Sequence, residues 1–264
     1  MAFKHTFISN STLACGRYDS LSGIELIESR YVQCDYGWPV LMDGRTITAK
    51  RVPVYPLFVS LFYKIFGIRQ WPVFAVQILL DSSMVILIFL ISKKLFGNEL
   101  SAVLSSCIYT LNLPSIIFTT QLMTDILAGF IFTSFLLAYI LTIKSPSNNR
   151  FLFLGFIFGL LVLTRVLFLT LLPLLSIGLY AGLPMKKRRR IKGVILMVIM
   201  VLMLITPWQY RNYREFGHYS LSNQAGIELY FWNAAKLHSE VEGFRHTISR
   251  KVFTKKSGIN EIKN

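Results

Sequence analysis

The sequence contains few acidic residues and few charged residues of any kind. Asp and Glu number 13 against 28 Lys and Arg in 264 residues, and charged residues make up 16% of a chain that is 53% hydrophobic. Soluble domains are roughly a quarter charged. The composition therefore excludes an ordinary soluble domain and predicts an integral membrane protein. The cysteines form no CxxC pair and the histidines are scattered without ligand spacing, so neither predicts a metal centre.

Two phosphate-binding motifs are also missing. No GxxxxGK[ST] loop and no GxGxxG turn occurs, so no cradle for ATP or a dinucleotide is visible. The net charge of +15 would suit a nucleic-acid-binding protein, but many of the cations stand in short clusters at the ends of apolar runs, such as Lys93-Lys94 and residues 186–190. Charge in that position sets membrane topology. We therefore expect a membrane and no nucleic acid as partner.

Long apolar runs are the main feature that is present. A full span needs roughly 20 apolar residues for a hydrocarbon core of about 30 Å, and four stretches qualify: 72–92, 100–118, 122–143 and 191–208. The stretch 151–183 is apolar except for Arg165 and would measure roughly 50 Å as one helix. We predict two short spans there that turn near Thr164 and Arg165.

Loop charge gives these spans an orientation. Lys93-Lys94, Lys144 with Arg150, and residues 186–192 carry excess cation in short loops, which predicts three cytoplasmic loops. Two cytoplasmic loops are joined by an even number of crossings, so about six spans are implied. The predicted class is an all-α polytopic transmembrane helix bundle with an outer-face loop that bears short amphipathic helices. Its predicted parts are the outer loop 1–71, the bundle 72–208 and an outer-side tail 209–264.

The outer loop is expected to contain two short helices. Apolar residues recur every three positions between Asp19 and Arg30, which predicts an amphipathic helix. Residues 52–67 are apolar and aromatic but contain Lys64 and two prolines, which favours an interfacial or half-embedded helix. An outside N-terminus of this length normally follows a first span, and none precedes Asp19. We therefore expect the chain to be an incomplete one.

Two acidic residues are candidates for chemistry on the outer face. Asp19 lies in a watery loop, where a carboxylate can act as a general base, or it merely caps the helix that follows. Asp125 lies where the span 122–143 begins. Ionisable groups at membrane depth indicate function, and the alternative is an N-cap formed with Thr124.

Two arginines are candidates for binding phosphate. Arg165 is the lone charge in its apolar stretch, and its guanidinium matches a phosphate bidentately. The alternative is an internal ion pair with Asp81, a deeply placed and more structural charge. Arg51 opens the rigid element Arg51-Val-Pro-Val-Tyr-Pro56, where it serves either as a second phosphate contact or as a cation at the headgroup level.

These residues carry a resemblance to a known family. The order of Asp19-Ser20, the Arg51–Pro56 element, two Phe-Gly pairs, Thr124-Asp125 and Pro207-Trp208-x-x-Arg211-Asn212-x-x-x-Phe-Gly resembles the dolichyl-phosphate-mannose protein mannosyltransferases of the GT-C superfamily (glycosyltransferase family 39). The likeness covers roughly residues 17–233 and resembles an N-terminal portion that lacks the first span. By this resemblance the catalytic base falls on Asp19, the second acidic position on Asp125, and lipid-phosphate binding on Arg165 and Arg51.

The resemblance implies an inverting glycosyltransferase in the plasma membrane. Its donor would be a polyprenyl- or dolichyl-phosphate sugar, and its acceptor hydroxyl would belong to a lipid, a glycan or a protein. No metal ligands are assigned, and the need for a divalent metal is left open. Two other hypotheses compete with this one: a transporter or lipid-handling bundle gated by an Asp81–Arg165 pair, and a non-catalytic fragment of the transferase family.

Overall fold

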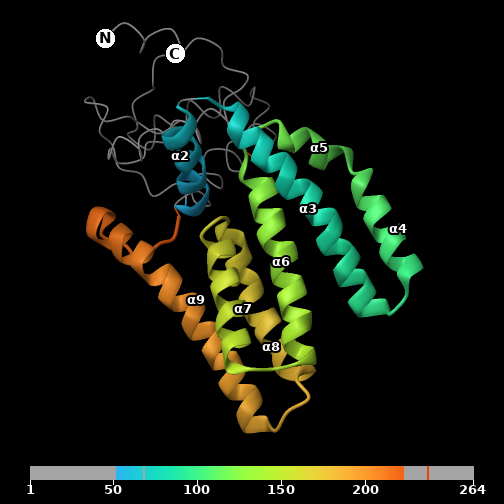
Figure 1. Cartoon of the computed structure of the whole chain (residues 1–264). Coiled ribbons are helices and arrows are strands. Elements are labelled where there is room, and N and C mark those ends of the chain that lie inside the picture. Colours follow the sequence, from blue (N-terminus) through green and yellow to red (C-terminus); the bar gives the residue numbers. More distant parts are fainter. Residues whose placement is uncertain (1–51, 68, 223–236, 238–264) are drawn as a thin grey trace, which may run out of the picture.

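The computed structural model of the chain describes residues 52–67, 69–222 and 237 (Figure 1). Every element within these ranges is a helix, which confirms the predicted all-α class. The elements in chain order are α2 (Val54–Phe66), α3 (Trp71–Phe96), α4 (Glu99–Thr110), α5 (Leu113–Thr119), α6 (Thr124–Lys144), α7 (Asn148–Val162), the 3-10 helix η1 (Val166–Leu171), α8 (Leu172–Gly182) and α9 (Lys187–Phe216). The outer loop before Val52, including the expected helix after Asp19, lies outside the described residues.

Three helices are long and apolar enough to cross a membrane. They are α3, α6 and α9, and α4 with α5 makes a fourth if this pair, bent by 56°, is counted as one span. These elements cover the stretches predicted as full spans, so the chain is a multi-pass membrane protein. The orientation and the total of six crossings remain predictions.

The apolar stretch 151–183 is broken near Thr164 and Arg165, where its length led us to predict a turn. Helix α7 ends at Val162, Arg165 has an extended backbone with φ −145° and ψ 113°, and η1 begins at Val166. The chain then continues in α8 to Gly182. Two short helices thus replace one helix that would be too long for a straight span.

Helices α7 and α9 pack closely because glycines line their contact. A Cβ on Gly155 would overlap the carbonyl oxygen of Met197, and one on Gly193 would come within 2.5 Å of the Phe151 ring. Lipid is as apolar as leucine, so helices in a bilayer associate mainly through close packing rather than through exclusion of water. These glycines allow α9 to pack along α7, and the contact belongs to the larger of two hydrophobic clusters.

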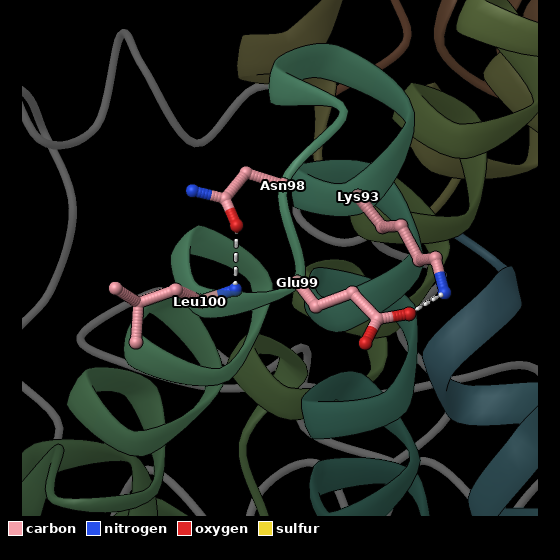
Figure 2. Close-up of polar contacts among 4 residues, drawn as sticks. All are labelled: Lys93, Asn98, Glu99 and Leu100. Carbon is pink, nitrogen blue, oxygen red and sulfur yellow. Dashed lines mark hydrogen bonds and ion pairs between the residues drawn. The ribbon is translucent and has the colours of Figure 1, made fainter.

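A tight turn reverses the chain between α3 and α4 (Figure 2). Gly97 adopts the left-handed conformation that ends α3, with φ 68°. The side chain of Asn98 then accepts a hydrogen bond from the backbone N–H of Leu100 at 3.0 Å, which caps α4. Lys93 and Glu99 form an exposed ion pair at 2.6 Å across the turn. The turn therefore sets α4 antiparallel to α3.

Two buried hydrophobic clusters meet near the start of α2. The larger one joins α6, α7, α8 and α9, and the smaller one joins α2, α3 and the beginning of α6. Val54 and Ile131 pack against both clusters. The first turn of α2 is therefore fixed against the bundle, as expected for a short helix that does not cross the membrane by itself.

Helix α9 extends beyond the predicted span 191–208. It contains Pro207 and continues to Phe216, where Gly217 ends it in the left-handed conformation with φ 76°. At about 1.5 Å per residue such a helix is roughly 45 Å long, which exceeds a hydrocarbon core of about 30 Å. The helix therefore crosses the boundary at 208/209 that the sequence suggested between bundle and tail.

Candidate functional site

Arg165 lies at the break between α7 and η1. The preceding residue, Thr164, is buried, and its hydroxyl donates to the carbonyl oxygen of Leu160 at 2.8 Å. This bond holds Thr164, the residue just before Arg165, against the last turn of α7. The extended backbone of Arg165 then takes its side chain off the helix, and 45% of that side chain stays exposed. The guanidinium is thus held on a fixed backbone with an accessible face.

Asp125 is the partner of that guanidinium. Nη1 of Arg165 lies 2.9 Å from Oδ1 of Asp125, and Nη2 donates to Oδ2 at 3.4 Å. This is a two-pronged contact between a planar guanidinium and a carboxylate. The Asp125 side chain is 30% exposed and stands in the first turn of α6. The N-cap of α6 is Met123 and forms no side-chain capping bond, so the alternative role considered for Asp125, an N-cap formed with Thr124, is not seen.

The beginning of α2 joins the same place. The backbone N–H of Val54 donates to the carbonyl oxygen of Leu163 at 3.1 Å, and Val52 is buried beside it. Three of the elements singled out in the sequence therefore meet: the part of the Arg51–Pro56 element from Val52 onward, the start of α6 and the α7–η1 break. Arg51 and Asp19 lie outside the described residues, so their predicted roles stay predictions.

The expected alternative of an Asp81–Arg165 pair is wrong. Oδ1 of Asp81 accepts hydrogen bonds from the Tyr109 hydroxyl at 2.6 Å and from the Ser115 hydroxyl at 2.5 Å. Arg165 instead pairs with Asp125, which is the carboxylate nearest to it on the neighbouring helix. Asp81 therefore serves a polar cluster among α3, α4 and α5, consistent with the structural role expected for it.

Gln77 was missed by the sequence reasoning. Its side chain is fully buried, and its Nε2 donates to the carbonyl oxygen of Gln121 at 3.0 Å, just before α6. The signal was present in the sequence. Gln77 and Asp81 are polar residues four positions apart in a largely apolar run, which places them on one face of a helix.

The cationic loops lie at the other end of the bundle. Lys144 Nζ donates to the carbonyl oxygen of Lys94 at 2.6 Å, which brings the ends of α3 and α6 together. The start of α9 joins this end through the contact of Gly193 with Phe151 at the start of α7. The start of α6 and the break after α7, which carry the Asp125–Arg165 pair, stand at the opposite end beside α2 (Figure 1). The side of the membrane that each end faces stays a prediction.

The end of α9 holds the segment after it in place. The indole Nε1 of Trp208 and the amide Nδ2 of Asn212 both donate to the carbonyl oxygen of Leu221, at 3.0 and 3.4 Å. The Arg211 guanidinium lies over the Trp208 ring, 4.8 Å from its centre, and donates to Oδ1 of Asn212 at 2.8 Å. This motif therefore binds the segment after α9 back onto the helix.

Within the described ranges, no group of three or more His, Cys, Asp or Glu residues is placed to hold a metal ion. Asp125 has Arg165 as its charged partner, and Asp81 has hydroxyl partners. Among the residues that the structure describes, the ion pair of the candidate site is thus formed by a guanidinium and a carboxylate. Such a pair binds an anion when some N–H donors of the guanidinium leave the carboxylate and form hydrogen bonds to the anion.

Comparison with known proteins identifies a family. Residues 50–210 match the family model described as dolichyl-phosphate-mannose-protein mannosyltransferase. The matched range begins just before α2 and runs into α9, so it contains both Asp125 and Arg165. No curated protein and no solved structure matches the chain.

Proposed function

The chain belongs to the dolichyl-phosphate-mannose-protein mannosyltransferase family, and from this membership we propose that it transfers a sugar from a dolichyl- or polyprenyl-phosphate donor to an acceptor hydroxyl. The transfer takes place at the outer face of the plasma membrane, where the predicted topology puts the Asp125–Arg165 pair. The observation that supports the proposal is this pair, because a guanidinium, a group suited to phosphate, lies at the break in the bundle beside α2.

The proposed reaction inverts the configuration at the anomeric carbon of the sugar. The Asp19 carboxylate accepts the proton of the acceptor hydroxyl, and the acceptor oxygen forms a bond to that carbon from the side opposite the phosphate. The bond between the carbon and the phosphate oxygen breaks, and the electron pair leaves with the lipid phosphate. The products are the glycosylated acceptor and the free lipid phosphate.

Arg165 binds the donor phosphate to a similar extent before and during the transfer, so its contribution lies mainly in donor affinity. Nearly half of its side chain is accessible, and its backbone is fixed by the α7–η1 break, so little reorganisation is needed when the phosphate arrives. Asp125 orients the guanidinium before the donor binds. Arg51, which precedes the α2 element fastened to Leu163, supplies a second cation to the phosphate.

The proposal is tested in vesicles that contain the full chain. Dolichyl-phosphate-mannose labelled in the sugar serves as donor and a Ser/Thr peptide as acceptor, and both the transferred label and the released dolichyl phosphate are measured. Removing a general base lowers rates by roughly 10²–10⁴-fold, so Asp19→Asn should reduce transfer at least a hundredfold. Asp43→Asn, in the same predicted loop, is the matched control. Near-normal transfer by Asp19→Asn would remove Asp19 from the role of base.

The competing hypothesis of a transporter depended on a gate formed by Asp81 and Arg165. Asp81 instead accepts hydrogen bonds from Tyr109 and Ser115. Arg165 pairs with Asp125. No contact among the described residues therefore favours a transporter over a transferase. A non-catalytic member of the family predicts that donor binds while no sugar is transferred, and the same assay separates that outcome.

A further inference from the structure

The polar face of α3 holds the segment that leads into the candidate site. Gln77 and Asp81 stand one helical turn apart, so their side chains leave α3 on the same side. Both make hydrogen bonds to residues between the end of α4 and the start of α6. Neither has a place in the proposed reaction.

Asp81 fastens both sides of the bend between α4 and α5. The Tyr109 hydroxyl belongs to the last turn of α4, and the Ser115 hydroxyl belongs to the first turn of α5. Both donate to the same oxygen, Oδ1 of Asp81, and the two hydroxyl oxygens are themselves 3.1 Å apart. Because one carboxylate oxygen joins the two helices, their 56° bend is tied to α3.

Gln77 fastens the turn that follows α5. The carbonyl oxygen of Gln121 accepts from Gln77 Nε2 and also from the backbone N–H of Met123 at 2.9 Å. Met123 is the N-cap of α6, and Asp125 is two residues further on. If the turn moved away, the side-chain N–H of Gln77 would lose its acceptor in an apolar surrounding, which costs free energy. The hydrogen bond therefore resists displacement of the turn.

We propose that Gln77 and Asp81 are positioning residues that hold α5 and the α5–α6 turn, and through them set the Asp125 carboxylate against Arg165. The catalytic consequence rests on the proposed function. Loss of either residue lets the start of α6 move, so that Arg165 loses the carboxylate that orients it and binds the donor phosphate less well. The effect appears in the donor KM more than in kcat.

A double-mutant cycle tests whether the residues act through Asp125. Asp81→Leu and Gln77→Leu should each raise the donor KM roughly tenfold, about the loss of one charge-assisted hydrogen bond. In a chain that already carries Asp125→Asn, the same substitutions should raise it no further. If the fold-changes in donor KM of the two single variants multiply in the double variant, the substitutions act independently of Asp125. That result would show a general loss of stability and overturn the proposal. Asp81→Asn keeps an acceptor oxygen for both hydroxyls and should restore most of the affinity.

A spectroscopic measurement tests the positioning without any activity. Cys15, Cys34 and Cys107 are replaced by serine, and spin labels are attached at Ser82→Cys on α3 and Thr120→Cys on the α5–α6 turn, both exposed positions. The distance distribution between the labels should broaden in Asp81→Leu and in Gln77→Leu. It should stay unchanged in Ser92→Ala, which removes another α3–α4 contact, the one from Ser92 to Ser105 at 3.1 Å.

The two measurements fail in different ways. An unchanged distance distribution in both leucine variants would overturn the positioning role whatever the enzyme does. A broadened distribution in a chain that transfers no sugar from dolichyl-phosphate-mannose would retain the positioning role and count against the proposed function.

Discussion

The backbone N–H of Val54 donates to the carbonyl oxygen of Leu163, so the first turn of α2 is fastened two residues before Arg165. The last carbonyl groups of a helix lack partners within it, and the break after α7 leaves that of Leu163 available. The Pro-rich entry to α2 and the arginine of the candidate site are thereby joined in one unit. The chemistry proposed for the outer face depends on this junction.

Arg165 should be sensitive to loss of its planar geometry as well as its charge. Arg165→Lys keeps the positive charge but not the two-pronged contact with Asp125. We expect the donor KM to rise roughly tenfold, on the order of one charge-assisted hydrogen bond, with a smaller change in kcat. Steady-state kinetics with dolichyl-phosphate-mannose measures both. A lysine variant with an unaltered donor KM would show that the guanidinium does not bind the phosphate.

The close packing of α7 on α9 should not tolerate a methyl group. The Cβ of Gly155→Ala would overlap backbone, the carbonyl oxygen of Met197, which cannot rotate away. We expect a loss of about 1–3 kcal/mol in stability, measured as a lower midpoint of thermal unfolding in detergent. Gly129→Ala is the control, because its Cβ would lie at an ordinary 3.4 Å from Met84. Equal midpoints for the two variants would contradict the packing argument.

Trp208 should stabilise the segment that follows α9. Trp208→Phe keeps an aromatic ring but removes the indole N–H that donates to the carbonyl oxygen of Leu221. The cost should be about 0.5–1.5 kcal/mol, seen as faster amide hydrogen exchange over residues 218–222. Tyr210→Phe, which removes a hydroxyl from an exposed side chain on the same helix, should leave exchange unchanged. Unaltered exchange in Trp208→Phe would mean that Asn212 suffices to hold the segment.

Cysteine labelling tests the predicted orientation. In a chain without its native cysteines, Thr120→Cys lies before α6 and Asn149→Cys lies at the start of α7, and both positions are exposed. A membrane-impermeant maleimide added to intact cells should label Thr120→Cys and leave Asn149→Cys unlabelled until the membrane is opened. The reverse pattern would put Arg165 on the cytoplasmic side and end the proposal of outer-face transfer.

Much of the helical architecture could be predicted because each helix in a bilayer must satisfy its own backbone. Apolar runs of sufficient length therefore mark α3, α6 and α9 with little help from tertiary contacts. The break at Thr164 and Arg165 was predictable from length, since residues 151–183 are too long for one crossing. The end of α9 was not, because an interior proline and a polar stretch after it also suit a loop.

The partner of Arg165 could not be predicted in this way. Asp81 and Asp125 both lie in or beside apolar runs, and a guanidinium can pair with either. The choice depends on how far along its helix each carboxylate stands. Asp125 lies in the first turn of α6, beside the α7–η1 break, while Asp81 lies deeper in α3 and accepts hydrogen bonds from α4 and α5.

The sequence by itself determined that the chain is a helical membrane protein, where the stretch 151–183 breaks, and which residues are candidates for chemistry, because these depend on local hydropathy, charge and length. It did not predict the 56° bend that divides the expected span 100–118 into α4 and α5. Only the tertiary structure decided which candidates meet. Ion pairs and buried hydrogen bonds join residues far apart in the chain, so Arg165 with Asp125 and Asp81 with Tyr109 and Ser115 follow from packing between helices.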